Sequence, residues 1–495
     1  MKQFLAISIV SILSVASYGQ NTFQEQFDTF KNEVHQQYVV YNDSINKVFI
    51  KSIEENWIKF QTNHPIPVPK KPIPQMDVQI APEESNSTLE LEIDSIIRQK
   101  ASSEDANLWN VPISSKEKGQ KTMVSYYGSE LQFLYFPEYK YFLTNLDEKT
   151  IASVWEQLSD SPYTELINTL LFYKNDMNLN DWGMFQLLSR ITEKFYPGRR
   201  NEQTIFSVFI MNQLGFRMKI GRCNNRLTPL VPFQTTVYGK PFINFDGEKY
   251  YILEDTNTDG GIYSYTIDYP NTIKHINLHA QRPFRLSLSL HAKQCHVGDK
   301  EYSININKNL IDLFQTYPQT EISVYANTPL SNITRKSLEK ELLPQLSDKT
   351  EQEAVNYLLQ FVQTSFEYKN DLQQFGYEKF FFAEELFYYP FSDCEDRSVL
   401  FSQLVRRFLG LQVVLLDYPD HVTTAVKFNT PVSGDFINVE GEKYIICDPT
   451  YLHAKVGQSI PRYKEQKLRS TYWINFFMFE CHKFILKQII EQITI

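Results

Sequence analysis

The spacing of apolar residues is most regular in the C-terminal third of the chain. Apolar positions recur at helical intervals over 394–409 and stop at Gly410, a common helix terminator. Apolar and polar residues then alternate from His421 onward, which predicts a half-buried strand that begins at this residue. A second strand follows the turn at 440–441 and ends at Asp448. The pattern therefore predicts one helix followed by strands.

The rest of the chain divides into segments of different pattern. Helical spacing covers 20–62, and the many prolines of 63–87 predict an extended linker. Strong alternation over 276–330, including E-I-S-V-Y-A at 321–326, predicts strands. The tail at 471–495 is apolar but interrupted by charges, so we expect a packed amphipathic helix rather than a membrane span.

Residues 173–257 repeat the pattern of 368–450. Tyr173-Lys174-Asn175-Asp176 recurs as Tyr368-Lys369-Asn370-Asp371. The run F-I-N-F-D-G-E-K-Y at 242–250 matches F-I-N-V-E-G-E-K-Y at 436–444 in seven of nine positions. We therefore interpret 88–272 and 273–470 as a tandem duplication of one unit, a period far longer than that of a solenoid repeat.

Three residues of the second copy have the types that an activated thiol requires. Cys394 lies in the first turn of its helix, where the helix dipole favours the thiolate. His421 can hold the thiol proton, and Asp448 can fix the tautomer and orientation of the imidazole. Cysteine, histidine and aspartate in this order predict a catalytic triad.

The first copy carries other residues at these positions. Opposite Cys394 stands Arg199, Arg200 or Asn201, depending on the gap; opposite His421 stand Leu227 and Thr228, and opposite Asp448 stands Glu254. The first copy therefore lacks the thiol and the imidazole, and we interpret it as a catalytically inactive scaffold or binding module.

The triad order, with D-C-E-D at 393–396 and D-P-T at 448–450, resembles the transglutaminase-like superfamily of the papain-like cysteine fold. The first motif is most similar to the bacterial transglutaminase-like cysteine proteinases. The resemblance covers roughly residues 330–465. It implies an α+β fold of two tandem transglutaminase-like units, the first degenerate, behind a helical N-terminal region. No glycine precedes Cys394 and no tryptophan follows it, which argues more against protein crosslinking than against the triad.

The resemblance also implies residues around the triad. Papain-like enzymes often use a glutamine upstream of the cysteine to bind the oxyanion, and Gln374 and Gln373 are the candidates. The related proteinases bind calcium with acidic residues beside the cysteine, which correspond to Asp393 and Glu395. In the alternative interpretation these two carboxylates only cap the helix. The sequence predicts no other cofactor and no other metal site.

Composition and the N-terminal sequence limit where the protein acts and which class of partner it binds. A net charge of −9 over 495 residues, without a basic stripe, argues against a nucleic-acid partner. Residues 1–19 have the charged start, apolar run and small residues of a cleavable signal peptide, so we expect an exported protein, periplasmic if the source is Gram-negative. Five cysteines are too few for a disulfide scaffold and leave at least one free thiol.

These observations predict a secreted cysteine peptidase or amidase that acts on a peptide or protein through a thioester at Cys394. Two alternatives remain open. The acyl group could pass to an amine instead of water, which is transglutaminase chemistry. The chain could also be a non-catalytic envelope binding protein whose triad is vestigial.

Overall fold

The computed structural model describes residues 46–55, 57–69, 81, 90–91, 119–254, 260–464 and 466–473. They form a mixed α and β protein whose neighbouring strands are mostly antiparallel. This mixture of helices and antiparallel sheets agrees with the predicted α+β class. The expected signal peptide at 1–19, residues 20–45 and most of the 471–495 tail lie outside the described residues. Within the part that is described, no helix combines the length and the apolar character needed to cross a bilayer.

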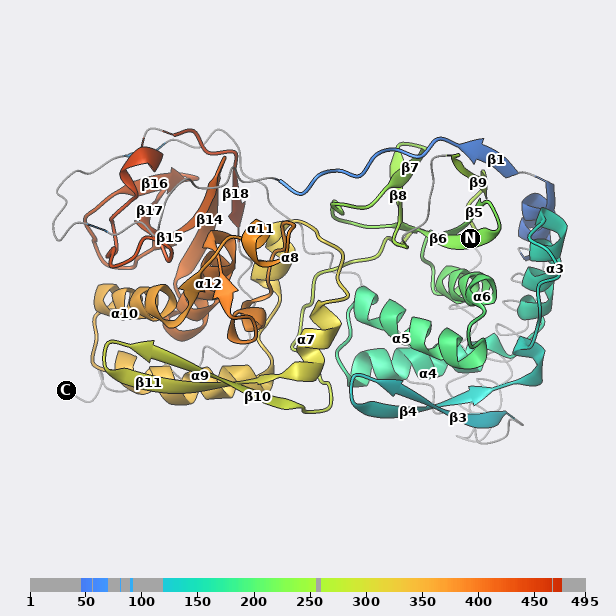
Figure 1. Ribbon diagram of the computed structural model, residues 1–495, viewed down its shortest axis with the longest axis horizontal. Coiled ribbons are helices and arrows are strands. Elements are labelled where there is room, and N and C mark those ends of the chain that lie inside the picture. The colour runs from blue at the N-terminus through green and yellow to red at the C-terminus, as the bar shows by residue number, and fades with distance from the viewer. Residues whose placement is uncertain are drawn as a thin grey trace, which may run out of the picture.

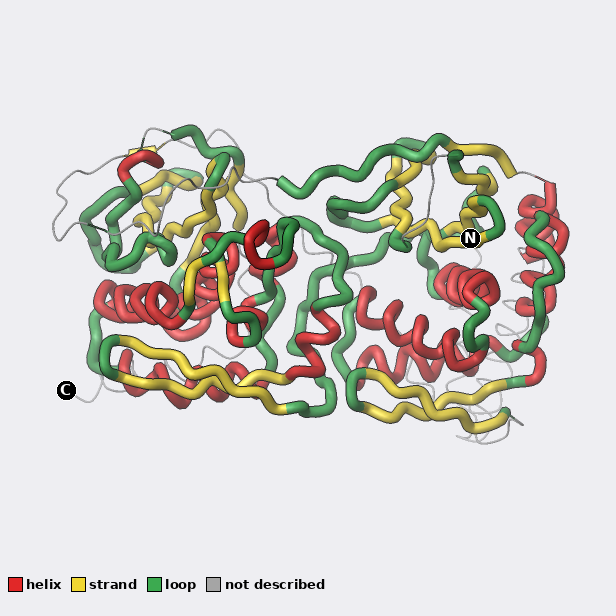
Figure 2. The backbone as a smooth tube through the Cα atoms, in the orientation of Figure 1, coloured by secondary structure: helices red, strands yellow, loops and turns green. Residues whose placement is uncertain are grey.

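In both halves of the molecule, central helices lie between a two-stranded hairpin and a larger sheet (Figure 1). Figure 2 shows the same arrangement by secondary structure, with red helices between yellow strands on either side. The first half contains the hairpin β3 (Gln120–Tyr126) and β4 (Ser129–Tyr135), and then α3 (Glu148–Ser159), α4 (Tyr163–Asp176), α5 (Asp181–Phe195) and α6 (Arg200–Gln213). Its sheet contains β1 (Trp57–Phe60), β5 (Lys219–Cys223), β6 (Arg226–Pro232), β7 (Phe242–Phe245), β8 (Glu248–Ile252) and β9 (Ile262–Tyr265).

The second half begins with its own hairpin and ends with its own sheet. The hairpin is β10 (Leu290–Val297) and β11 (Lys300–Asn307), followed by α7 (Lys308–Phe314), α8 (Ile322–Asn327), α9 (Asn332–Leu346), α10 (Glu351–Ser365), β12 (Glu367–Tyr368), α11 (Asp371–Gln374), β13 (Phe391–Ser392) and α12 (Cys394–Leu409). The sheet contains β2 (Glu90–Leu91), β14 (Gln412–Tyr418), β15 (His421–Lys427), β16 (Phe436–Val439), β17 (Glu442–Cys447) and β18 (Ser470–Trp473). Short 3₁₀ helices lie at Pro137–Tyr139, Ala383–Phe387 and Pro461–Tyr463.

The two sheets share one strand order. The first runs β1-β9-β5-β6-β8-β7 and the second runs β18-β14-β15-β17-β16-β2, so that five strands correspond one to one. Each sheet has one additional edge strand from the N-terminal part of the chain, β1 in the first and β2 in the second. Residues far upstream therefore pair with both sheets.

The helices correspond by packing rather than by the sequence motif that suggested the repeat. Helix α5 packs against β3 and α6, and α10 packs against β10 and α12. Helix α4 packs against β4, as α9 does against β11. The connection 366–393 thus stands where the first half has only 196–199. The pairing of Tyr173–Asp176 with Tyr368–Asp371 does not follow this correspondence, because the first motif ends α4 and the second lies inside the long connection.

Helix α12 forms because its apolar positions recur on one face and its two ends are closed. The Asp396 carboxylate accepts the backbone N–H of Asp393 at 3.3 Å, and Gly410 ends the helix at a φ of 69°. The helix packs on β14 and β15. Strand β15, expected to be half-buried, is buried on both faces because a second apolar cluster around Tyr444 and Tyr451 covers the side away from α12.

Three segments differ from the expected secondary structure. The predicted N-terminal helix is present at 46–55, but Trp57–Phe60 forms β1, because these four residues pair with β9. Within 276–330, where strands were predicted, β10 and β11 are strands, but Lys308–Phe314 forms α7 and Ile322–Asn327 forms α8, which is buried against α12. The 63–87 segment is more than a spacer, since Asn63 pairs with Phe242 and Ala81 N–H donates to the Leu452 carbonyl at 2.9 Å.

Candidate active site

Cys394 is the first residue of α12 and is 3% exposed. Its thiol lies 3.0 Å from Glu395 Oε2, to which it donates, and its sulfur accepts the backbone N–H of Val422 at 3.4 Å. Because Val422 directly follows His421, the second contact fixes the start of β15 beside Cys394. The first contact places the Glu395 carboxylate directly against the thiol.

His421 and Asp448 form a buried hydrogen-bonded pair. His421 Nε2 lies 2.8 Å from Asp448 Oδ2, and the two residues are 4% and 1% exposed. Adjacent strands bring them together, because β15 pairs with β17 through Thr424 and Cys447. The structure therefore unites the histidine and the aspartate that the sequence identified.

The Asp448 carboxylate is held in its ionised form. Burial raises its pKa, but the His421 imidazole and the backbone N–H groups of Thr450 and Tyr451 lower it by more, so that the pKa of Asp448 lies below the usual range. Those two N–H groups donate to Oδ1 at 2.9 and 3.1 Å, which leaves Oδ2 for the imidazole. An ionised, oriented carboxylate is what an orienting residue in a triad must be.

Tyr463 completes the surroundings of the imidazole, and sequence reasoning missed it. Its ring stacks on His421 with centroids 4.8 Å apart and an interplanar angle of 12°. Its hydroxyl accepts from Arg462, whose guanidinium also pairs with Asp420 at 3.2 Å. The only available signal was an aromatic residue in the stretch after Asp448, which is too common a feature to single out.

The two oxyanion candidates lie in different environments. Both are on α11, but Gln373 is exposed and only its backbone N–H is engaged, with Asn370 Oδ1 at 3.0 Å. Gln374 Nε2 is enclosed and has no hydrogen-bond partner among the described residues. Of the two, Gln374 therefore has the unpaired buried amide, a group that is costly unless something binds to it.

Several carboxylates lie close to Cys394. Oxygens of Asp371, Glu378 and Glu395 lie within 4.8 Å of one another, and Asp393, Cys394 and Glu395 form a second such group. Burial, and then the charge of Glu395, raise the pKa of Asp371 to about 8. Oxygen ligands of this kind suit a hard cation such as calcium. The predicted pair Asp393 and Glu395 thus belongs to a larger set that could hold a metal ion.

The long connection that carries these groups is anchored by Glu384. This fully buried carboxylate accepts the Ser331 backbone N–H, the Ser331 hydroxyl at 3.0 Å and the Thr334 hydroxyl at 2.7 Å, and so binds the N-terminus of α9. Burial raises the pKa of Glu384 despite these donors. The folded state therefore retains a proton to higher pH than the unfolded chain does.

This anchor makes stability depend on pH. A raised carboxyl pKa means that stability falls as pH rises from the unfolded pKa of about 4.3 toward the folded pKa. We expect the free energy of unfolding of Glu384→Gln to fall less than that of the wild type when the pH is raised from 5 to 8. Urea unfolding at both pH values measures this difference. Glu367→Gln, at an exposed position, is the matched control and should follow the wild type. An unchanged pH dependence in Glu384→Gln would contradict the assignment.

The first half carries a different set at the corresponding positions. Strands β5 and β6 turn between the paired residues Cys223 and Arg226, as β14 and β15 turn between Tyr418 and His421. Arg226, rather than Leu227 or Thr228, is thus the counterpart of His421, because the two-residue turn sets the register. Arg226 Nη2 pairs with Glu254 Oε2 at 2.6 Å.

Asn201 replaces the thiol in this arrangement. Its Oδ1 accepts the Leu227 backbone N–H at 2.8 Å, the bond that Val422 makes to Cys394 in the second half. An amide and a guanidinium supply neither a nucleophile nor a base near neutral pH. The first half therefore keeps the geometry of the pair without its chemistry.

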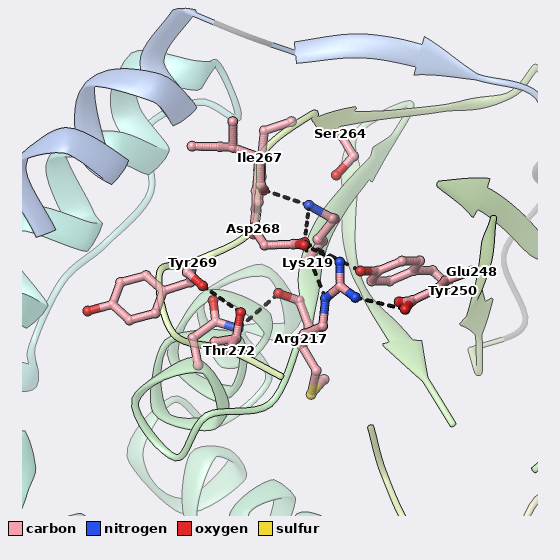
Figure 3. Close-up of polar contacts among 12 residues, drawn as sticks. Arg217, Lys219, Glu248, Tyr250, Ser264, Ile267, Asp268, Tyr269 and Thr272 are labelled. Carbon is pink, nitrogen blue, oxygen red and sulfur yellow. Dashed lines mark hydrogen bonds and ion pairs between the residues drawn. The ribbon is translucent and has the colours of Figure 1, made fainter. Parts of the chain in front are cut away.

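The most buried charges of the first sheet have structural partners. Lys219 Nζ lies 2.7 Å from Asp268 Oδ1 and 2.5 Å from the Ile267 carbonyl, and Arg217 binds Asp268 and Glu248 (Figure 3). Burial lowers the pKa of Lys219 even though Asp268 opposes the shift. These bonds fasten β5 to the segment after β9. No chemistry follows from them.

The histidine and cysteine side chains of β10 do not form a metal site. On β10 Cys295 points inward while His291 and His296 are exposed, so the three side chains do not converge on a metal. Burial raises the pKa of the Cys295 thiol to about 12 and also raises that of Cys447. Among the described cysteines, both are therefore poor nucleophiles.

Comparison with known proteins yields no relative. No protein-family model matches the chain, and neither the curated proteins nor the solved structures include a significant match. The case for a function therefore rests on the residues and geometry of the site itself.

Proposed function

We propose that the chain is an exported cysteine hydrolase of the transglutaminase-like kind, with Cys394, His421 and Asp448 as its triad. The observation that carries the proposal is the buried 2.8 Å bond between His421 Nε2 and Asp448 Oδ2 beside the first residue of α12. This bond assigns Nε2 to the carboxylate and leaves the other ring nitrogen for a proton from the thiol.

The reaction would proceed in two steps. The Cys394 sulfur attacks an amide carbonyl and forms a C–S bond, while His421 passes the thiol proton to the leaving amine as the C–N bond breaks. Water, deprotonated by His421, then attacks the thioester, which releases the acid and returns the proton to sulfur. The Cys394 backbone N–H and Gln374 Nε2 would bind the oxyanion in both steps.

Charged groups of both signs lie near the start of α12. Glu395 accepts the thiol hydrogen bond, and the Arg397 guanidinium, one turn along the helix, is 1% exposed. A calcium ion on Asp371, Glu378 and Glu395 would neutralise carboxylates at this point. The thiol proton itself is still accepted and passed on by His421, as in the two steps above.

The common strand order supports a second part of the proposal, that the chain contains two related units. The five matching strands and the equivalent hairpins fit a duplication in which only the second unit kept catalytic residues. Asn201 and Arg226 in the first unit account for its proposed inactivity. The helical N-terminal region and the exported location rest on the sequence pattern of 1–62.

Alkylation of Cys394 tests the triad. We expect iodoacetamide to modify Cys394 at pH 6, well below the free-cysteine pKa of about 8.5, and His421→Ala to abolish this low-pH reactivity. Peptide mass mapping identifies the modified residue, and Cys481→Ser removes the one cysteine outside the described residues. A Cys394 thiol that titrates normally and ignores His421 would overturn the proposal.

Burial of the triad favours a second candidate, a non-catalytic binding protein. Cys394, His421 and Asp448 are each less than 5% exposed, and the thiol donates its hydrogen bond to Glu395. A substrate could reach the sulfur only after some of the residues that bury Cys394 had moved. If Cys394→Ala preserves the biological role of the protein, this second candidate replaces the first; if added amines appear in the product, the acceptor is an amine rather than water.

A further inference from the structure

One glutamine on α10 binds the segment that carries Asp448. Gln363 is 3% exposed and lies near the C-terminal end of the helix. Its Nε2 lies 3.0 Å from the Asp448 carbonyl, 2.8 Å from that of Tyr451 and 3.1 Å from that of Ala454. Its Oε1 accepts the His453 backbone N–H at 3.2 Å. All four contacts of the carboxamide are with one turn of chain.

These contacts determine where the carboxylate stands. Asp448 directly follows β17. Its carboxylate accepts the backbone N–H groups of Thr450 and Tyr451 in the same turn. The carboxamide of Gln363 has two N–H hydrogens, which are shared among three carbonyl oxygens of the turn. The turn is therefore held at several points rather than at one. Displacing the turn would displace Oδ2, which lies 2.8 Å from His421 Nε2.

The same helix end is bonded to the nucleophile's helix. Arg397 on α12 donates to the Phe366 carbonyl at 2.6 Å and to the Gln363 carbonyl at 3.5 Å. Cys394 lies one turn before Arg397 on that helix. The end of α10 therefore contacts both the segment of the aspartate and the helix of the cysteine, two parts of the site that are distant in sequence.

The first half provides an internal comparison. Helices α5 and α10 have equal length and both pack between a hairpin strand and a central helix. Residues 191–194, in the last turn of α5, contain no glutamine, and Glu193, which has the same position as Gln363 counted from the helix start, is exposed and lies 3.7 Å from Arg190. The fold alone thus does not require a glutamine here. The contact occurs in the half that has the histidine and aspartate.

We propose that Gln363 is a positioning residue of the triad: its carboxamide holds the Asp448 turn so that Oδ2 faces His421. The inference rests on the proposed function. It adds a residue of α10 to a site otherwise built from α12, β15 and β17. Gln363 acts only through Asp448 and does not itself contact the reacting atoms.

Two variants test the role. Gln363→Glu keeps the shape and the acceptor for His453 but removes the donated bonds, and Gln363→Met keeps the volume and removes all four contacts. The matched control is Gln360→Met, at an exposed position one turn earlier on the same helix. The readout is the rate of Cys394 alkylation from pH 5 to pH 9, alongside circular dichroism of each variant.

We expect both Gln363 variants to remain folded and to lose about ten- to a hundred-fold of their alkylation rate at pH 6, since a displacement of about 1 Å can cost about 100-fold. At pH 9 the rate should approach that of the wild type, because the thiol then ionises without help. A purely structural defect would instead lower the rate at all pH values or leave it unchanged, and either result in a folded variant overturns the inference. If the wild type itself shows no His421-dependent reactivity, the proposed function fails, which is a separate result.

Discussion

Replacing Asp448 with asparagine is expected to slow alkylation of Cys394 at pH 5.5 by about 100-fold, since each pH unit below a thiol pKa lowers its thiolate fraction about tenfold. Asparagine keeps the shape of the side chain but removes the charge that stabilises the imidazolium, so the thiolate–imidazolium pair no longer persists in acid. The pH-dependent rate of alkylation by iodoacetamide is the measurement.

The assay window follows from the direction of the Asp448 pKa. The folded pKa is depressed, so the carboxylate and the stability that it contributes are present above the unfolded pKa of about 3.9 and are lost as pH falls through the folded value. At pH 5.5 the wild-type carboxylate is therefore ionised. Asp435→Asn is the control, because Asp435 is also buried and binds the chain that follows Asp448, at Ser459 and Lys464. An equal loss in both variants would mean that the segment, and not the orientation of His421, had been damaged.

Replacing Trp155 with alanine is expected to lower the free energy of unfolding by about 3–5 kcal/mol, the usual cost of truncating a buried tryptophan. Trp155 on α3 is 0% exposed. Its ring lies 5.0 Å from that of Phe49 and 5.2 Å from that of Phe209. The truncation therefore leaves a cavity where the 46–55 helix meets α3 and α6.

Urea unfolding followed by circular dichroism measures this effect. Phe172→Ala serves as the control, since that side chain is 55% exposed and its loss should change stability by less than about 0.5 kcal/mol. If Trp155→Ala lost no more than Phe172→Ala, the N-terminal helix would not be an integral part of the first half.

Local periodicity was a reliable guide where a segment's own residues decide its structure. Helix α12 and strand β15 begin at the predicted residues, Cys394 and His421, because their apolar spacing extends over several turns or pairs. Short segments failed for the opposite reason. Residues 321–326 alternate and are rich in β-branched and aromatic side chains, yet they form α8 because packing against α12 buries every residue of the helix.

The sequence by itself determined the residue types of the candidate site and their order along the chain. It identified Cys394, His421 and Asp448, and the structure joins the last two because β15 and β17 pair antiparallel. It also showed that the first half lacks the thiol. The exact counterpart of His421 required the strand register, which assigned Arg226.

Only the tertiary structure decided what surrounds the three residues of the candidate site. Tyr463 stacks on His421 from the segment after Asp448, Gln363 reaches Asp448 from another helix, and Glu395 turns its carboxylate to the thiol. None of these contacts has a signal in local spacing, because each joins groups through side-chain direction and packing between elements. Periodicity specifies which face of an element is buried, whereas the neighbour of a buried polar group depends on how all the elements pack together.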